Sequence, residues 1–201
     1  MVGCERIDGS PEFQRWAVKK TWFISDTHFG HARIIEMASR PFSDVDAMDE
    51  AMIARWNARV APEDVVWHLG DFAVTSDAVR VAAIFRRLHG EKHLVLGNHD
   101  EHYEATRALP WASIGETARG EADRQAFFLC HYPMLTWPGA RRGAAHLFGH
   151  MHGRLPGCDM SCDMAVEAWD YAPAQMADIR GRMRKQRPDP DFDPKRSKAR
   201  R

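Results

Sequence analysis

The chain has 201 residues, a length that suits one domain with a hydrophobic core rather than two. Hydrophobic residues make up 44% and charged residues 28%, which is ordinary for a globular protein, and the formal net charge is zero. The charge is uneven, because the segment from Arg180 to Arg201 holds ten Lys or Arg against three Asp or Glu. The rest of the chain is therefore mildly acidic, and no broad basic face typical of a nucleic-acid-binding domain is predicted.

The two ends of the chain lie outside the predicted domain, which we place at residues 19–186. Residues 9–13 resemble a linker left by a cloning vector, so residues 1–18 are excluded from the fold prediction, with a native N-terminal segment as the alternative. Residues 187–201 combine Asp-Pro repeats with Lys and Arg, which predicts a disordered basic tail. No secretory signal is evident, and no apolar run approaches the ~20 residues of a membrane helix.

Cysteine usage agrees with an intracellular setting. The four cysteines form no Cys-x-x-Cys motif, and without a secretory signal reduced thiols are expected. A bridge or a metal site between Cys158 and Cys162 remains an alternative. We therefore predict a cytoplasmic protein.

The first half of the domain alternates strand and helix patterns. Runs of β-branched and aromatic residues predict strands at residues 21–24, 65–69 and 93–96. Helical spacing predicts helices at residues 32–37, from a cap at Ser43 or Asp44 to about residue 60, and from a cap at Ser76 to residue 88, with Val79 facing inward. This alternation favours a largely parallel sheet.

The second half predicts a different arrangement. Residues 113–118 and 125–129 flank a polar turn segment, which is a hairpin signature, and residues 144–148 and 164–166 are further predicted strands. Pro173 is expected to begin a last helix that runs to about residue 185. The whole pattern predicts an α/β (α+β) domain without internal repeats.

Five short polar blocks follow these elements in chain order: Asp26-Thr27-His28, Gly70-Asp71, Gly97-Asn98-His99-Asp100, His131 and Gly149-His150-Met151-His152. Most of their residues are metal-ligand or proton-transfer types. Residues i and i+2 of an extended strand point to the same side, so Asp26 and His28 are predicted to face one ion, and His150 and His152 to face the same cavity. Mixed carboxylate and imidazole donors favour Mn, Fe, Zn or Ni over Ca.

The blocks predict two coordination sets that share Asp71. The first set is Asp26, His28, Asp71 and His152, and the second is Asp71, Asn98, His131 and His150. Two such divalent ions lower the pKa of a bridging water to roughly 7, which predicts attack by a metal-bridging hydroxide. His99 is left over as the predicted catalytic residue, to stabilise phosphoryl oxygens or to protonate the leaving alkoxide. Each block alone is a weak signal, since a lone histidine such as His131 is more often a buried, hydrogen-bonded side chain.

The order Asp-x-His, Gly-Asp, Gly-Asn-His-Asp, His, Gly-His-x-His resembles that of the calcineurin-like metallophosphoesterase superfamily, and the chain looks most like its small single-domain bacterial and phage members. Residues 22–31 and 131–134 strengthen the resemblance, which runs from about Thr21 to Arg180. It implies a four-layer αββα fold with two β-sheets face to face and helices outside, a dinuclear site at the strand ends, and hydrolysis of phosphoester bonds. It also implies the ligand sets above and a catalytic His99. Ala32-Arg33 departs from the Asn expected in the most similar relatives, so different substrate contacts are expected at Arg33.

Four further residues are predicted as substrate contacts with weaker support: His31, Arg40, Trp137 and Arg141. His31 and Arg40 would reach a phosphate, whereas loop packing and an ion pair within the fold are their respective alternatives. The segment 137–142 lies between two ligand blocks, which predicts a rim where Trp137 stacks on a base and Arg141 reaches phosphates. An exposed turn is the alternative for this segment.

The leading functional prediction is a phosphoesterase that uses two divalent ions, with manganese as the favoured metal. Phosphodiesters are favoured over monoesters, because the chain is too short to supply a cap domain over the site, although an open site suits monoesters too. The expected substrate is a phosphoester, with a nucleotide or a nucleic-acid end as candidates, and no membrane partner is expected. One alternative is a metal-binding scaffold that is catalytically weak, which the presence of His99 disfavours; another is a nucleic-acid-processing nuclease recruited by the basic tail. The sequence leaves the oligomeric state open.

Overall fold

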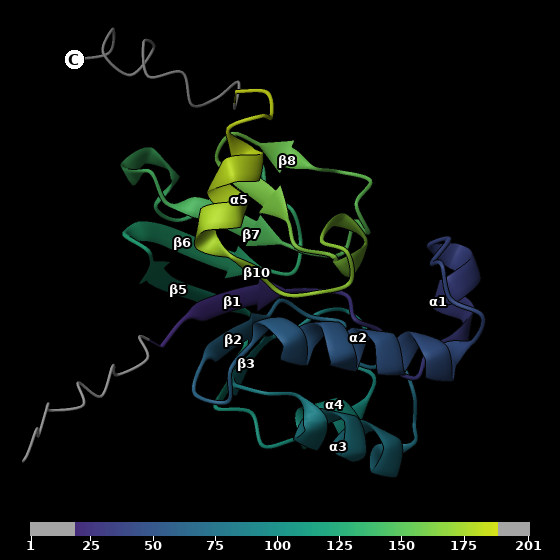
Figure 1. Ribbon diagram of the computed structural model, residues 1–201. Coiled ribbons are helices and arrows are strands. Elements are labelled where there is room, and N and C mark those ends of the chain that lie inside the picture. The colour runs from purple at the N-terminus through teal and green to yellow at the C-terminus, as the bar shows by residue number, and fades with distance from the viewer. Residues whose placement is uncertain (1–18, 189–201) are drawn as a thin grey trace, which may run out of the picture.

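The computed structural model describes residues 19–188, which form two five-stranded β-sheets packed face to face with helices on their flanks (Figure 1). The strand order is β10-β1-β2-β3-β4 in the first sheet and β5-β6-β7-β9-β8 in the second. This arrangement confirms the predicted mixed α/β fold. The predicted linker-like residues 1–18, and residues 189–201 of the predicted tail, lie outside the described part of the chain.

The first sheet is largely parallel, as the alternation of strands and helices predicts. Its strands are β1 (Thr21–Ile24), β2 (Val65–His68), β3 (Glu91–Val95), β4 (Ser113–Gly115) and β10 (Ala174–Gln175). The first four run parallel to one another, and β10 pairs antiparallel with β1. The carboxyl ends of β1, β2 and β3 therefore meet at one edge, where the first three polar blocks follow them.

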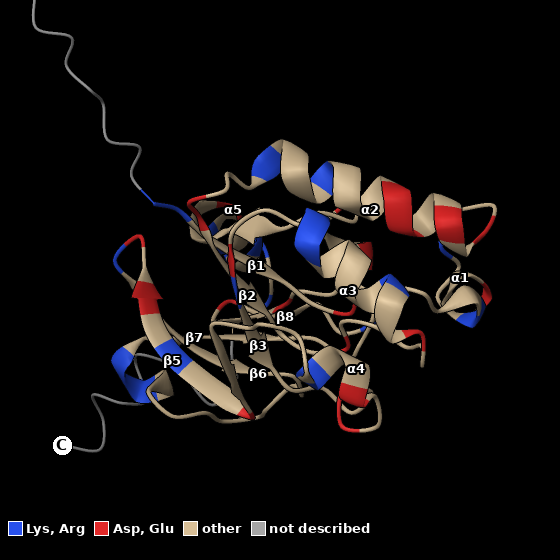
Figure 2. Ribbon diagram, turned by 90° about the horizontal axis from the view of Figure 1, so that it is seen from below, with Lys and Arg blue, Asp and Glu red and all other residues tan. Residues whose placement is uncertain are grey.

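Four helices accompany the first sheet: α1 (Ala32–Met37), α2 (Val45–Arg59), α3 (Ala78–Arg87) and α4 (Glu104–Arg107). The carboxylate of Asp44 caps α2 by accepting from the backbone N–H of Ala47 at 2.8 Å. Asp46 lies in the first turn of α2 and Arg59 in the last, which complements the helix dipole, and Figure 2 shows acidic and basic residues at opposite halves of this helix.

Helix α3 differs from the prediction at its start. Asp77 rather than Ser76 is the cap, and its side chain accepts from the backbone N–H of Arg80 at 2.9 Å. Val79 is 79% exposed, because it lies on the face of α3 opposite to the core, so its predicted inward orientation is wrong. Val81, Ile84, Phe85 and Leu88 are buried instead, at the helical spacing that suits one apolar face.

The second sheet contains β5 (Thr117–Ala122), β6 (Gln125–Cys130), β7 (Ala145–Phe148), β8 (Gly157–Cys158) and β9 (Ser161–Asp163). The β5–β6 hairpin agrees with the prediction, whereas the single strand predicted at residues 113–118 is wrong. Its two ends belong to different sheets, because the chain bends at Glu116 and passes from β4 in one sheet to β5 in the other.

Two later boundaries also differ from the prediction. Residues 164–166 form no strand, since Ala165 makes a single bridge to Ser25 and Val166 begins the short 3-10 turn η2 (Val166–Ala168). The last helix, α5 (Met176–Met183), begins after Ala174–Gln175 because these residues pair with β1.

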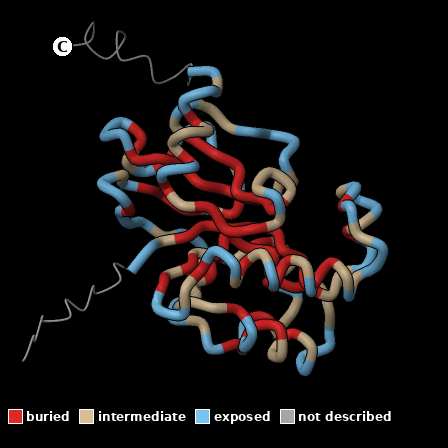
Figure 3. Tube along the Cα trace, in the orientation of Figure 1, coloured by how far each residue is buried: buried red, intermediate tan, exposed pale blue. Residues whose placement is uncertain are grey.

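The strands of the first sheet bury side chains on both faces. Trp22 and Ile24 point toward α2 and α3, whereas Phe23 between them points toward the second sheet, where it meets Phe127 at a ring distance of 5.2 Å. Figure 3 shows the buried positions concentrated along the strands. Helix α5 packs against β1 and β9 and adds Ile179 to the core between the sheets.

The outer face of the second sheet is covered by the chain around the 3-10 turn η1 (Ala140–Arg142), where Trp137 and Ala140 pack on Phe128. Within residues 19–188, Cys130 and Cys162 form no disulfide bond. None of the helices within residues 19–188 combines the length and apolar character needed to cross a membrane.

A buried carboxylate ties the start of β1 to the turn before β2. Asp64 accepts hydrogen bonds from the backbone N–H of Lys20 at 2.9 Å, the indole N–H of Trp22 at 2.8 Å and the backbone N–H of Ala61 at 3.0 Å. Although burial acts to raise the pKa of Asp64, these hydrogen bonds hold it below its ordinary value. Their stabilisation is therefore present above the unfolded-state pKa and is lost as the pH falls through the folded-state pKa.

The Asp64→Ala variant is expected to lose about 2–4 kcal/mol of unfolding free energy at pH 7, because three donors lose their acceptor. Urea denaturation measures this loss. The neighbouring Glu63→Ala, at an exposed position, is the matched control and is expected to stay within about 0.5 kcal/mol of the wild type. Equal stability of the two variants would contradict a structural role for Asp64.

Candidate metal centre

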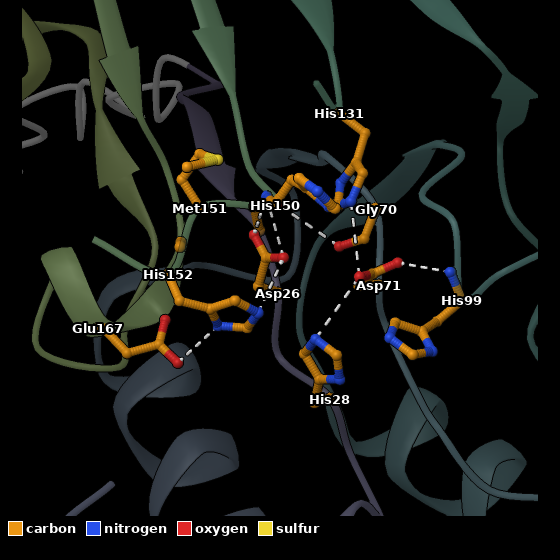
Figure 4. A network of polar contacts seen from close by, with 12 residues as sticks. Asp26, His28, Gly70, Asp71, His99, His131, His150, Met151, His152 and Glu167 are labelled. Atoms are coloured by element: carbon orange, nitrogen blue, oxygen red, sulfur yellow. Dashed lines mark hydrogen bonds and ion pairs between the residues drawn. The ribbon is translucent and has the colours of Figure 1, made fainter. Parts of the chain in front are cut away.

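The seven predicted ligands converge at the edge where strands of both sheets end (Figure 4). Asp71 lies at the centre of the group, and its Oδ2 atom is 3.6 Å from Nε2 of His28 and 3.5 Å from Nε2 of His131. On one side, Asp26, His28 and His152 bring their ligand atoms within 4.8 Å of one another. The arrangement thus brings together the first predicted coordination set.

The second predicted set meets on the other side of Asp71. The Oδ1 atom of Asn98 lies 3.0 Å from Nδ1 of His150 and 3.2 Å from Nε2 of His131. The Nδ1 atom of His131 is 2.7 Å from the carbonyl oxygen of Leu69. With that nitrogen as the donor, the lone pair of Nε2 points toward Asp71, as a metal ligand requires.

The backbone of the ligand residues is unusual and departs from the extended geometry that the sequence suggested. Five of the seven have positive φ: Asp26 at 56°, His28 at 52°, Asp71 at 59°, His150 at 68° and His152 at 49°. Each therefore lies in the left-handed region, which residues other than glycine rarely adopt. The ligands converge because the chain turns sharply after each strand, and not because alternate residues of a strand share a face. Such conformations persist only where the surrounding structure enforces them.

Two glycines of the polar blocks leave room for the ligand carboxylates. A Cβ atom at Gly149 would lie 1.9 Å from Oγ of Ser25 and 2.5 Å from Oδ2 of Asp26, and one at Gly97 would lie 2.3 Å from Oδ1 of Asp71. Glycine is needed at both positions because of these close approaches. The backbone N–H of His150, directly after Gly149, can then donate to the Asp26 carboxylate at 3.0 Å.

Asp100 is a structural member of the third block that the sequence prediction did not assign. Its carboxylate is buried and accepts from the backbone N–H groups of Asp71 at 2.7 Å, Gly97 at 2.9 Å and Phe72 at 3.1 Å. It therefore joins the loop after β2 to the loop after β3. The position of Asp100 directly after Asn98 and His99 is the sequence feature that could have identified it as a site residue.

Arg40 is buried behind the ligand residues and is not among the residues that line the cleft described below, which argues against the predicted substrate contact. Its guanidinium is fully buried and donates to the backbone carbonyls of Thr27 at 2.8 Å and Asp26 at 2.7 Å. It also pairs with Glu167 at 2.8 Å, in agreement with the alternative of an ion pair within the fold. Glu167 in turn lies 3.0 Å from Nδ1 of His152. The chain Arg40–Glu167–His152 thus supports two members of the first ligand set from behind, and Glu167 was missed because nothing in its local sequence marks it.

The other three predicted substrate contacts have different positions. His31 faces the site, with its Nδ1 atom 3.2 Å from Nδ1 of His28. Trp137 is buried, and its indole N–H donates to the carbonyl of Ala144 at 2.7 Å, so the prediction that it stacks on a base is wrong. Arg141 is exposed on η1 and is not among the residues that line the cleft described next.

A cleft of about 620 Å³ opens over the metal centre. Its lining joins the ligand residues to α1 and to the loop after β7: His28, His31, Arg33, Ile34, Met37, Ala38, Ser39, Asp71, Asn98, His99, His150, His152 and Arg154. The backbone N–H of His99 donates to Oδ1 of Asp71 at 2.9 Å, and its ring lies 5.1 Å from that of His28. His99 is therefore beside the ligands and accessible from the cleft. The volume of the cleft suits a small-molecule ligand.

The electrostatics of the site fit divalent cations. The buried Nε2 atom of His28 has no hydrogen-bond partner among the described residues, and burial lowers the pKa of this histidine well below its ordinary value, so it offers a free lone pair. Burial raises the pKa of the Asp26 carboxyl to about 7. Burial also acts to raise the pKa of Asp71, but His131 and His28 hold it well below its usual range. A buried pair of carboxylates surrounded by imidazoles is a donor set that transition-metal ions satisfy.

Removal of the negative charge of Glu167, which lies behind His152, is expected to weaken metal binding. The Glu167→Gln variant should bind Mn²⁺ about 10–100-fold more weakly, because His152 loses the charged partner that orients its ring. Calorimetric titration measures the affinity, and thermal unfolding of the metal-free variant separates this effect from loss of the fold. The exposed Glu121→Gln on β5 is the matched control. An unchanged affinity in Glu167→Gln would show that the contact does not support the ligand.

Metal uptake is expected to strengthen as the pH rises from about 6 to about 9. Burial acts to lower the pKa of His131, but the hydrogen bond and charge of Asp71 outweigh it and raise this pKa to about 9 in the metal-free protein, while Asp26 titrates at about 7. Below these values each group carries a proton that it must release to bind an ion, so the apparent affinity rises up to about tenfold per pH unit for each proton. Mn²⁺ titrations across this range test the prediction, and a pH-independent affinity would contradict it.

Comparisons with known proteins point to one family. A model of the calcineurin-like phosphoesterase superfamily domain matches residues 20–155. An uncharacterized protein of Methanocaldococcus jannaschii is 38% identical over 96 residues, which are 47% of this chain and 54% of that protein. The gene 66 protein of Mycobacterium phage L5 is 36% identical over 85 residues, which are 41% of this chain and 41% of that protein. The chain spans about half the length of the curated relatives it matches.

A solved structure shares the fold. The crystal structure of a protein of unknown function from Aquifex aeolicus is 26% identical, with a TM-score of 0.67, and the match covers 82% of this chain and 99% of that one. The family model spans more than half of the chain and includes all five polar blocks. The chain therefore belongs to the calcineurin-like phosphoesterase superfamily.

Proposed function

We propose that the protein is a phosphoesterase that uses two divalent metal ions to hydrolyse phosphodiesters, with manganese as the first candidate metal. The observation that carries the proposal is the convergence of two ligand sets on Asp71, with His99 beside them in an open cleft. Asp26, His28, Asp71 and His152 would hold one ion, and Asp71, Asn98, His131 and His150 the other. When bound, the ions supply an activated water and positive charge for the phosphoryl oxygens.

The residues around the ligands fix how the site presents its donors. Nδ1 of His28 and Nδ1 of His31 are 3.2 Å apart, so one proton is shared between them. Because Nε2 of His28 has to be unprotonated to act as a ligand, that proton belongs to Nδ1 of His28, and Nδ1 of His31 accepts it. The neutral His31 ring then carries its own proton on Nε2. This leaves His31, which lines the cleft, with an N–H donor available for a phosphoryl oxygen.

His99 is the candidate general acid. Its backbone is anchored by the hydrogen bond to Asp71, so its ring stays beside the ligand groups while it lines the cleft. From there the ring can deliver a proton to the departing oxygen of the ester, which matters most when that oxygen is a poor leaving group. The open cleft and the lack of a covering domain within residues 19–188 support diesters as substrates over monoesters.

The Mn²⁺-loaded wild type is expected to hydrolyse bis(p-nitrophenyl) phosphate, and His99→Ala is expected to separate leaving groups. The variant should lose about 10²–10⁴-fold in kcat on an alkyl phosphodiester, because the alkoxide needs a proton, and much less on the activated aryl diester. The matched control is His102→Ala at an exposed position.

Three results would count against this proposal. A wild type that stays inert after Mn²⁺ loading would contradict the phosphoesterase itself. Equal losses on both esters would contradict the acid role and assign His99 to phosphoryl binding. Activity that survives removal of metal by a chelator would contradict the metal dependence.

A further inference from the structure

We propose that the same cleft holds a binding site for a second phosphate group of the substrate, formed by Arg33 and Arg154, so that the natural substrate is a small phosphoester with a further phosphate. The inference rests on the proposed function and deepens it. Met37 and Ala38 lie next to this site and would face the nucleoside part of a nucleotide.

The cleft lining divides into two regions. One is the metal centre with His31 and His99, which the hydrolysis of any phosphoester would use. The other is built from α1 and the residues after it on one side, and from Arg154 on the other. Figure 1 shows α1 standing at one side of the molecule, away from the two sheets. This second region contributes nothing to the two ligand sets and is free to select the substrate.

Both arginines of the second region lack an acidic partner. Among the described residues, ion pairs are formed by Arg40, Arg55, Arg80 and Arg87, but by neither Arg33 nor Arg154. The guanidinium of Arg154 donates through Nε to the carbonyl of Met151 at 3.2 Å, which holds it near the last ligand block. Its terminal nitrogens remain available for an anion, and guanidinium groups suit phosphate because they offer paired donors.

The charge of the lining favours a substrate with more than one anionic group. Asp71 is the one acidic residue among the described residues that line the cleft, and it is committed to the metal centre. Two bound divalent ions and two unpaired arginines then leave a clear excess of positive charge. A single phosphodiester carries one negative charge, so a second phosphate would compensate the remainder.

The cleft lining beside Arg33 includes apolar residues. Met37 is 68% exposed, and Ile34, one turn earlier on α1, also lines the cleft. Arg33 and Met37 are four residues apart on α1 and therefore lie on the same face of the helix. Methionine is flexible and polarisable, and it adapts to flat apolar groups. A nucleoside that links the phosphate at the metal centre to the second phosphate would have these apolar groups beside it.

A nucleic-acid strand fits the surface outside the cleft less well. Figure 2 shows Lys and Arg interspersed with Asp and Glu along the elements rather than gathered in one continuous track. Strand binding relies on several successive phosphate contacts, so a small molecule is the favoured occupant.

Two substrates with the same leaving group test the proposal. Thymidine 5′-(p-nitrophenyl phosphate) is compared with its 3′-phosphorylated form, with bis(p-nitrophenyl) phosphate as a measure of basal activity. The wild type should hydrolyse the 3′-phosphorylated form with at least about tenfold higher kcat/KM. Arg33→Ala and Arg154→Ala should each lose about tenfold on that form and remain unchanged on the other two substrates. Arg107→Ala, exposed on α4 and outside the cleft lining, is the matched control.

The outcomes separate this proposal from the proposed function. Hydrolysis of bis(p-nitrophenyl) phosphate, with equal kcat/KM on both thymidine esters and no effect of either arginine variant, would overturn the second phosphate site alone. If no ester is hydrolysed, calorimetric binding of thymidine 3′,5′-bisphosphate to the Mn²⁺-loaded protein still tests it: affinity about tenfold above that of thymidine 5′-monophosphate, lost in Arg33→Ala, supports the site, and equal affinity overturns it. Preference for a single-stranded oligonucleotide over both thymidine esters would also overturn it, in favour of a nucleic-acid substrate.

Discussion

The carboxylate of Asp71 is the point on which the rest of the site depends. Its Oδ2 atom lies between His28 and His131, its Oδ1 atom accepts the backbone N–H of His99, and its own backbone N–H is held by Asp100. The side chain is 2% exposed, so its charge has no water to stabilise it. A fold that places a carboxylate there, beside Asp26 and several imidazoles, favours the binding of cations. The two ligand sets, the position of His99 and the cleft above them all follow from where Asp71 is fixed.

Buried residues outside the cleft hold the ligand residues in this arrangement. Five ligand residues adopt left-handed backbone conformations, each of which costs of order 1–3 kcal/mol. Buried polar contacts oppose that cost: Arg40 binds the carbonyls of Asp26 and Thr27, and Asp100 binds three backbone N–H groups after β2 and β3. These supports lie outside the cleft, whereas Arg33 and Arg154, which we propose to select the substrate, line it.

The sequence predicted the parts of this structure that local chemistry determines. The strands before the first polar blocks, the parallel order of the first sheet and the meeting of the seven ligand-type residues were all accessible, because apolar runs and residue types carry that information. The sharp turns after the strands were not accessible, since the sequence does not show which aspartate or histidine adopts a positive φ. Arg40 and Trp137 were misassigned for a related reason: burial and partners such as Glu167 and Ala144 depend on tertiary contacts across the chain.

We propose that Asp71 is shared by two ions. Anomalous diffraction at the manganese absorption edge, from crystals of the Mn²⁺-loaded protein, is the decisive measurement. Two peaks per chain are expected, about 3.5–4 Å apart, on either side of the Asp71 carboxylate. One peak is expected beside Asp26, His28 and His152, and the other beside Asn98, His131 and His150. A single peak, or two peaks that leave Asp71 uncoordinated, would show that Asp71 is not shared.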